Sequence, residues 1–171
     1  QALKALLLSL AFMRADENGF RVIPPEKVLI AIPGEQADNP ETPQNESVTM
    51  RMRKTILSHE LSHGEFFTNP DYARYCEDFW RYSLSPSQRE SFTHFLSSVQ
   101  HYDVRNESLL INEFQAYLAY SGTDGVFFRD DAVPGIDKAE MKRLRKRFLD
   151  RSPALFTPVL EDAEGAATGN E

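Results

Sequence analysis

The sequence predicts a mainly α-helical domain (α+β) with a small β element near its amino terminus. Apolar side chains recur at helical spacing along most of the chain, whereas β-branched runs of strand length occur only before Pro33. Asn-Pro and Ser-Pro pairs, which favour helix starts, precede two of the periodic stretches. Because the expected strands are few and short, the core is predicted to be helical.

The composition indicates one folded domain, expected at residues 1–151, followed by a C-terminal tail at 152–171. The chain has 171 residues, 41% hydrophobic and 11% aromatic, which suffices for a core and excludes a disordered chain. A net charge of −7 argues against nucleic acid as a partner. The single cysteine, Cys76, excludes an internal disulfide framework and a Cys-rich zinc finger.

No stretch of the sequence is long and apolar enough to predict a membrane span. The apolar run from Ala5 to Met13 is cut short by Arg14 and Asp16, so we interpret it as part of a core helix. The chain begins with Gln1, so a mature or trimmed form is expected, with any targeting signal out of view. An exported, periplasmic location is slightly favoured over a cytoplasmic one, and the oligomeric state is left open.

The first part of the chain is predicted to contain one helix and two strands. Residues 3–14 have leucines at helical spacing, and a turn is expected at 16–19. Two short runs, 20–23 and 28–32, are predicted strands. Residues 33–47 are rich in proline and acidic side chains, so they are expected to form a solvated loop.

The remainder is predicted to be helical. After the helix that carries the histidines described below, helices are expected at residues 69–82, 85–99 and 103–120, the last one capped by Asp103. The final helix begins at Asp137, which with Glu140 resembles a capping box. Its cations are predicted to form a solvated face, with binding of an anionic partner as the alternative. These cations are Lys142, Arg143, Arg145, Lys146 and Arg147.

Residues 55–64 carry the pattern on which the functional prediction depends. His59, Glu60 and His63 form H-E-x-x-H, and on a helix the two histidines share one face and can bind one metal ion. Glu60 is turned by about 100° and so stands beside the metal. Gly64 is expected to end this helix. The alternative is a pair of histidines on a core-facing stripe, but a zinc site is favoured.

A catalytic zinc site usually needs a third protein ligand. Glu113 lies on the apolar stripe of its predicted helix, where an ionised carboxylate is costly unless it is paired or coordinated. Glu113 is therefore the preferred ligand, with pairing to a core tyrosine or an arginine as the alternative. His94 and His101 are poorer candidates, and Asp124 is a weak alternative ligand.

Here the sequence resembles the gluzincin zinc metallopeptidases, in which H-E-x-x-H is joined by a glutamate on a later helix. The stretch Asn112-Glu113-Phe114-Gln115-Ala116 fits the N-E-x-x-A form of that later helix, and Phe66 matches the H-E-L-x-H-x-x-F of the aminopeptidase branch. The wider run is similar to uncharacterised bacterial zinc peptidases. The resemblance covers about residues 50–120 and implies a zincin-like helical core.

The sequence also departs from that family. Thermolysin-like enzymes carry an aspartate four residues after the glutamate, to orient a zinc histidine, but here that position is Tyr117. The G-A-M-E-N-like strand of the aminopeptidases is absent. The metzincin pattern is excluded, because Phe66 and Asn69 occupy the positions of its glycine and third histidine.

The predicted activity is zinc-dependent hydrolysis of peptide bonds in a peptide or protein substrate. Zinc on His59, His63 and Glu113 activates a water, and Glu60 is the general base. The oxyanion needs a further donor, for which His101 and Tyr102 are preferred and Tyr117 remains open. Ordinary interhelical packing is the alternative role for these three residues.

Two other functions stay open. One is a zinc-stabilised, non-catalytic interaction module, although a purely structural site does not need a base. The other is a hydrolase of a non-peptide amide.

Overall fold

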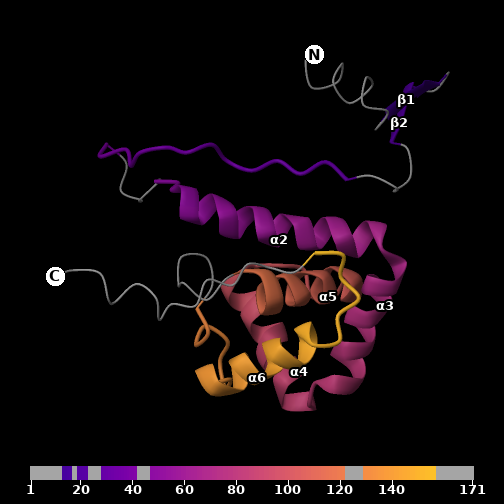
Figure 1. The fold of residues 1–171 in the computed structure, drawn as a ribbon, viewed down its shortest axis with the longest axis vertical. Coiled ribbons are helices and arrows are strands. Elements are labelled where there is room, and N and C mark those ends of the chain that lie inside the picture. Colours follow the sequence, from indigo (N-terminus) through magenta and orange to yellow (C-terminus); the bar gives the residue numbers. More distant parts are fainter. Residues whose placement is uncertain (1–12, 17–18, 23–27, 42–46, 122–128, 157–171) are drawn as a thin grey trace.

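The computed structural model describes residues 13–16, 19–22, 28–41, 47–121 and 129–156. Within these residues the chain is mainly helical, as the sequence predicts, and α2 crosses above the other helices in Figure 1. Three of the helices continue into a π-helical turn, labelled η. The elements are α2 (Met50–Thr68), α3 (Pro70–Asp78) with η1 (Phe79–Ser83), α4 (Pro86–His94) with η2 (Phe95–Val99), α5 (Glu107–Gln115) with η3 (Ala116–Tyr120), and α6 (Lys138–Leu149).

The β element is a hairpin of β1 (Met13–Asp16) and β2 (Gly19–Val22). The strands pair antiparallel, with Met13 opposite Val22 and Asp16 opposite Gly19. The second strand confirms most of the strand predicted at 20–23. The helix predicted at 3–14 is wrong for its last two residues, which belong to β1, because the turn signal at 16–19 joins two strands. Residues 3–12 lie outside the described residues.

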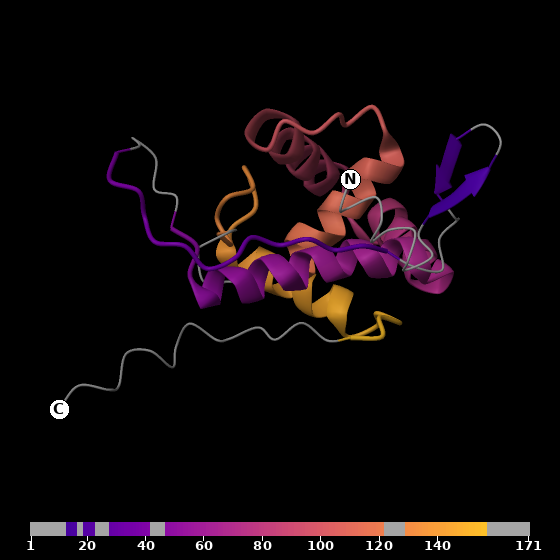
Figure 2. The same ribbon diagram turned by 90° about the horizontal axis from the view of Figure 1, so that it is seen from above.

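Residues 28–36, which we call the extended segment, run antiparallel to α2 (Figures 1 and 2). Arg53 of α2 donates from Nε to the carbonyl oxygen of Pro33 at 3.1 Å, and Gln36 pairs with Val48 through backbone hydrogen bonds of 3.2 and 2.9 Å. Side chains at 28–32 alternate between half-buried and exposed. The strand predicted there is nevertheless wrong, because among the described residues this stretch has no strand partner.

Gly64 was predicted to end the histidine helix, and this is wrong because α2 continues to Thr68. A Cβ atom at position 64 would lie 2.9 Å from Cγ2 of Val28 in the extended segment. The glycine therefore permits a close approach of that segment to the helix. Asn69 ends the helix instead: its N–H still donates to the carbonyl oxygen of Glu65 at 2.8 Å, but its own backbone is extended, with φ −117° and ψ 96°.

The later helix starts largely follow the sequence signals. The side chains of Asn69, Ser85 and Asp137 cap α3, α4 and α6, as predicted. The cap predicted at Asp103 is wrong: Asn106 caps α5, while the Asp103 carboxylate accepts from Arg105. The capping box predicted at the start of α6 is incomplete, because the Glu140 carboxylate accepts from Gln88 of α4 at 2.6 Å.

The core is built around α5 and η3, where every residue from 110 to 121 is buried. The ring of Phe114 is edge-on to Trp80 and Phe92, with centroids 5.0 and 4.8 Å apart. Arg145 was predicted on the solvated face of α6 but is buried. Its guanidinium donates to the carbonyl oxygen of Leu118 and to Asp130, both at 2.7 Å, so it satisfies buried acceptors.

The first residues of the predicted tail lie against the domain. Ala154 and Phe156 pack on the core cluster, and the N–H of Leu155 donates to the Glu65 carboxylate. Residues 157–171 lie outside the described residues. Where the structure describes the chain, none of its helices has both the length and the apolar character needed to cross a membrane.

Candidate metal centre

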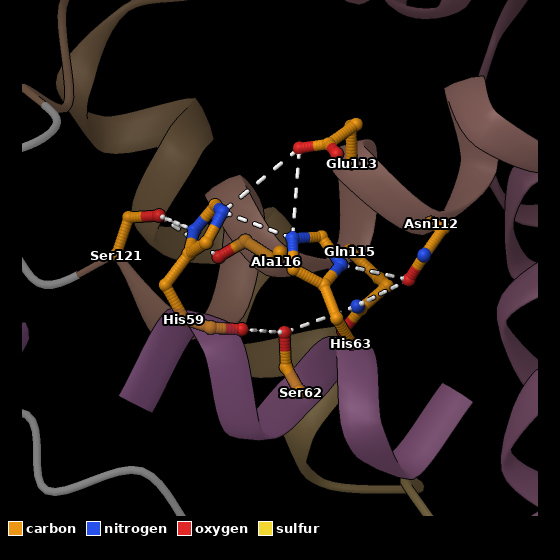
Figure 3. Close-up of polar contacts among 8 residues, drawn as sticks. All are labelled: His59, Ser62, His63, Asn112, Glu113, Gln115, Ala116 and Ser121. Atoms are coloured by element: carbon orange, nitrogen blue, oxygen red, sulfur yellow. Dashed lines mark hydrogen bonds and ion pairs between the residues drawn. The ribbon is translucent and has the colours of Figure 1, made fainter. Parts of the chain in front are cut away.

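The α2 helix places both predicted histidine ligands on the side facing α5 and η3. Thr49 caps the helix by accepting from the N–H of Met52, and His59 and His63 follow one above the other. Their Nε2 atoms are 3.1 Å apart, and the two rings are nearly perpendicular. Figure 3 shows both Nε2 atoms directed toward the same point.

Glu113 of α5 reaches that point from the opposite side (Figure 3). Its Oε2 atom lies 3.9 Å from Nε2 of His59 and 3.7 Å from Nε2 of His63. The structure thus brings together the three ligands predicted from the sequence, and their donor atoms form a group able to hold one metal ion. Glu113 is buried, as its place on the apolar stripe predicted.

Glu113 Oε2 is a buried oxygen that has no hydrogen-bond partner among the described residues. Burial raises the pKa of Glu113, and the nearby charge of Glu60 acts in the same direction. His63 and the Tyr102 hydroxyl act to lower this pKa, but burial has the larger effect. An ionised carboxylate in such a place is costly unless a cation offsets it. The orphaned oxygen therefore points toward a cation at the centre of the triad.

The donor set fits zinc. Two histidine nitrogens and one carboxylate oxygen form a known catalytic combination, in which a fourth position stays open. Zinc bonds of ~2.1 Å in tetrahedral geometry separate two ligand atoms by roughly 3.4 Å. The separations of 3.1, 3.7 and 3.9 Å bracket this value.

Asn112 fixes the ring of His63. Its Oδ1 lies 3.0 Å from Nδ1 of His63 and also accepts from Nε2 of Gln115 at 3.2 Å. The Gln115 amide is oriented in turn, because its Oε1 accepts from the Tyr72 hydroxyl at 2.6 Å. Since Asn112 presents an acceptor, Nδ1 of His63 carries the proton and Nε2 keeps a lone pair for a metal.

The role of Asn112 was missed in the sequence, although the residue stands in the N-E-x-x-A motif. A polar residue beside Glu113 on a buried helix is the available signal. Ser121 was missed as well: its Oγ lies 2.8 Å from Nδ1 of His59. No sequence signal indicates this contact, because it depends on how η3 packs against α2.

Glu60, the predicted general base, is half-buried and lies beside the triad. Its charge is near enough to raise the pKa values of Glu113 and Tyr117. It also shares a face of α2 with Arg53 and Gly64, seven residues before and four after it, and both contact the extended segment. Glu60 is thus located between the triad and that segment.

Two of the predicted oxyanion donors lie near the triad. The Tyr102 hydroxyl lies close enough to Glu113 and Tyr117 to affect the pKa of each, and burial, followed by the charge of Glu113, raises the pKa of Tyr102. Tyr117 is buried with its ring edge-on to His59, at a centroid distance of 5.0 Å, and burial also raises its pKa. Both tyrosines therefore keep their protons near neutral pH.

The remaining candidates stand apart from the triad. His101 is exposed, with a positive φ of 61°, and among the described residues it forms no hydrogen bond or ion pair with the three candidate ligands. His94 is also exposed, and its Nδ1 lies 3.3 Å from Oγ of Ser98. Asp124, the alternative ligand, lies outside the described residues.

Comparison with known proteins adds no relative. No protein-family model matches the chain, and searches of curated proteins and of solved structures found no match.

Proposed function

We propose that this protein is a zinc-dependent hydrolase of peptide bonds, with His59, His63 and Glu113 as metal ligands. The observation that carries the proposal is the buried Oε2 of Glu113, which has no hydrogen-bond partner among the described residues and faces two histidine nitrogens. When bound, zinc supplies Lewis acidity and makes water a nucleophile near neutral pH. The side chain of His63 is 16% exposed against 3% for that of His59, so access from solvent is expected on the His63 side.

Glu60 is proposed as the general base. Its carboxylate lies next to the triad without being part of it, so it is free to take a proton from the attacking water. The same carboxylate then returns the proton to the leaving amine. Tyr102 is proposed as a donor to the oxyanion, because its hydroxyl keeps its proton and already reaches Glu113.

The extended segment is proposed to hold the substrate. Apart from the pairing of Gln36 with Val48, its backbone lacks a strand partner among the described residues, and it runs along the stripe of α2 that includes Glu60. An extended peptide that pairs with such a backbone gains main-chain hydrogen bonds whatever its side chains are. This arrangement favours a peptide over a small amide as the substrate.

The test compares the wild type with Glu60→Gln on a denatured protein library, with zinc content measured in each sample. Glu60→Gln removes the base and leaves the three ligands, so turnover should fall by ~100-fold or more at equal zinc content. Leu61→Gln is the matched control, because it places the same side chain on the next, exposed position of α2. Equal turnover by wild type and Glu60→Gln contradicts the mechanism.

The non-catalytic interaction module is separated from the enzyme by a second measurement. An open coordination position binds a hydroxamate, so the zinc-loaded wild type and Glu60→Gln are both expected to bind one tightly. A zinc-loaded protein that binds no hydroxamate and hydrolyses no peptide is the module instead.

A further inference from the structure

The hydrogen bonds of Ser121 determine which nitrogen of His59 carries the proton. The Ser121 hydroxyl donates to the carbonyl oxygen of Ala116 at 3.0 Å, and its Oγ lies 2.8 Å from Nδ1 of His59. A serine hydroxyl has one proton to donate. Because that proton is used on Ala116, Oγ accepts from His59, and Nδ1 of His59 must carry a hydrogen.

A hydrogen on Nδ1 determines the state of Nε2, the other ring nitrogen of His59. With its hydrogen on Nδ1, neutral His59 has a lone pair on Nε2, the atom that faces His63 and Glu113. The opposite tautomer would place a hydrogen inside the triad. Ser121 is wholly buried and His59 is 2% exposed, so water does not easily replace this contact.

The π-helical turn η3 brings Ser121 to this position. The hydroxyl reaches back to the fifth preceding carbonyl, that of Ala116, which is the spacing of a π turn rather than of an α-helix. Tyr117, four residues after Glu113, instead packs its ring against the edge of His59. The wider turn thus lets one helix supply a ring contact from Tyr117 and a hydrogen-bond acceptor from Ser121.

We propose that Ser121 is a positioning residue that holds His59 in the metal-binding tautomer, and that η3 serves to place it. The inference depends on metal binding at the proposed site but not on peptide hydrolysis. A histidine ligand commonly needs such a partner at its second nitrogen, and loss of the partner weakens metal binding ~10- to 100-fold.

The experiment measures tautomer and zinc affinity in the same variants. In the metal-free wild type near pH 7.5, ¹⁵N NMR should show a protonated Nδ1 and an unprotonated Nε2 for His59. Ser121→Ala should shift His59 toward the other tautomer and weaken zinc binding, measured by chelator competition, ~10- to 100-fold. Ser121→Thr keeps the hydroxyl and should restore both properties.

Ser62→Ala is the matched control. Ser62 is as buried as Ser121, but its hydroxyl donates to the backbone oxygen of His59 at 2.6 Å and accepts from Nε2 of Gln115 at 3.1 Å, and it does not bond to the His59 ring. This variant is expected to lose stability while it keeps the His59 tautomer of the wild type, and the lost contact to Gln115 should weaken zinc binding less than Ser121→Ala does.

Two results overturn the inference. One is a protonated Nε2 in the metal-free wild type, which needs no variant and so does not depend on the folding of Ser121→Ala. The other is a Ser121→Ala protein with unchanged tautomer and zinc affinity. Normal zinc affinity and tautomer without any hydrolysis would count against the proposed peptidase function and leave this inference standing.

Discussion

The two faces of α2 meet very different surroundings. On the inner face, His59 and Ser62 are buried, and each is hydrogen-bonded within the protein. On the outer face, Met50, Leu57 and Leu61 are 50%, 39% and 39% exposed. On the inner face, contacts with other parts of the protein determine the geometry of the side chains. On the outer face, the exposed side chains contribute little to stability or to the site. Substitutions are therefore expected to differ sharply in effect from one face to the other.

The largest expected effect concerns the buried histidine. Burial, together with the charge of His63, lowers the pKa of His59 from its ordinary 6.5 to about 3. The unfolded chain then binds a proton that the folded metal-free protein does not. The contribution of neutral His59 to the free energy of unfolding is fully present above about pH 6.5. It is lost as the pH falls toward about 3, by up to ~1.4 kcal/mol per pH unit.

Urea unfolding with a chelator present, repeated at several pH values, tests this. His59→Gln should flatten the loss of stability on the acid side. His94→Gln, at an exposed position, is the control and should keep the wild-type slope. Parallel profiles for wild type and His59→Gln would show that the inner face does not hold His59 in its neutral form.

The next effect concerns Asn112. Asn112→Ala leaves Nδ1 of His63 without its acceptor and Gln115 without one of its partners. Zinc affinity is expected to fall ~10- to 100-fold, measured by chelator competition. Tyr72→Phe removes only the hydroxyl that orients Gln115, so it should weaken zinc binding less. An equal loss of zinc affinity in Asn112→Ala and Tyr72→Phe would contradict the expectation that the direct contact to His63 matters more.

Gly64 tests the boundary between α2 and the extended segment. Gly64→Ala gains ~1 kcal/mol of helix propensity but adds a Cβ atom 2.9 Å from Cγ2 of Val28. Overpacking of this kind costs ~1–3 kcal/mol, so a net loss of ~1 kcal/mol is expected in thermal or urea unfolding.

Val28→Ala provides the control for this clash. In the double variant with Gly64→Ala the clash disappears and only the propensity gain remains, so the two substitutions should couple favourably by ~2 kcal/mol. Strict additivity would mean that the extended segment does not press on the helix at this position.

The smallest effect is expected on the outer face. Leu61→Gln replaces a side chain that is 39% exposed, and its effect on stability should stay within ~0.5 kcal/mol. Zinc affinity should equal that of the wild type, measured under the same conditions as for Asn112→Ala. A large loss in either quantity would indicate that the outer face is covered in solution.

The predictions from sequence succeeded where structure depends on neighbours along the chain. Helical periodicity placed His59 and His63 on one face and Glu113 on a buried stripe, and the caps at Asn69 and Ser85 were recognised. Errors arose where distant segments meet. Gly64 was interpreted as a helix end, because the close approach of Val28 has no signature near the glycine.

By itself the sequence determined the residue types and helical faces of the candidate site. The three candidate ligands and the neighbouring Glu60 follow from a spacing of four residues and from a carboxylate on an apolar stripe. Only the tertiary structure decided how those ligands are held. Asn112 and Ser121 reach the two imidazole rings because α5 and η3 pack across α2, and hydrogen bonds over 49 and 62 residues of chain cannot be inferred from local periodicity.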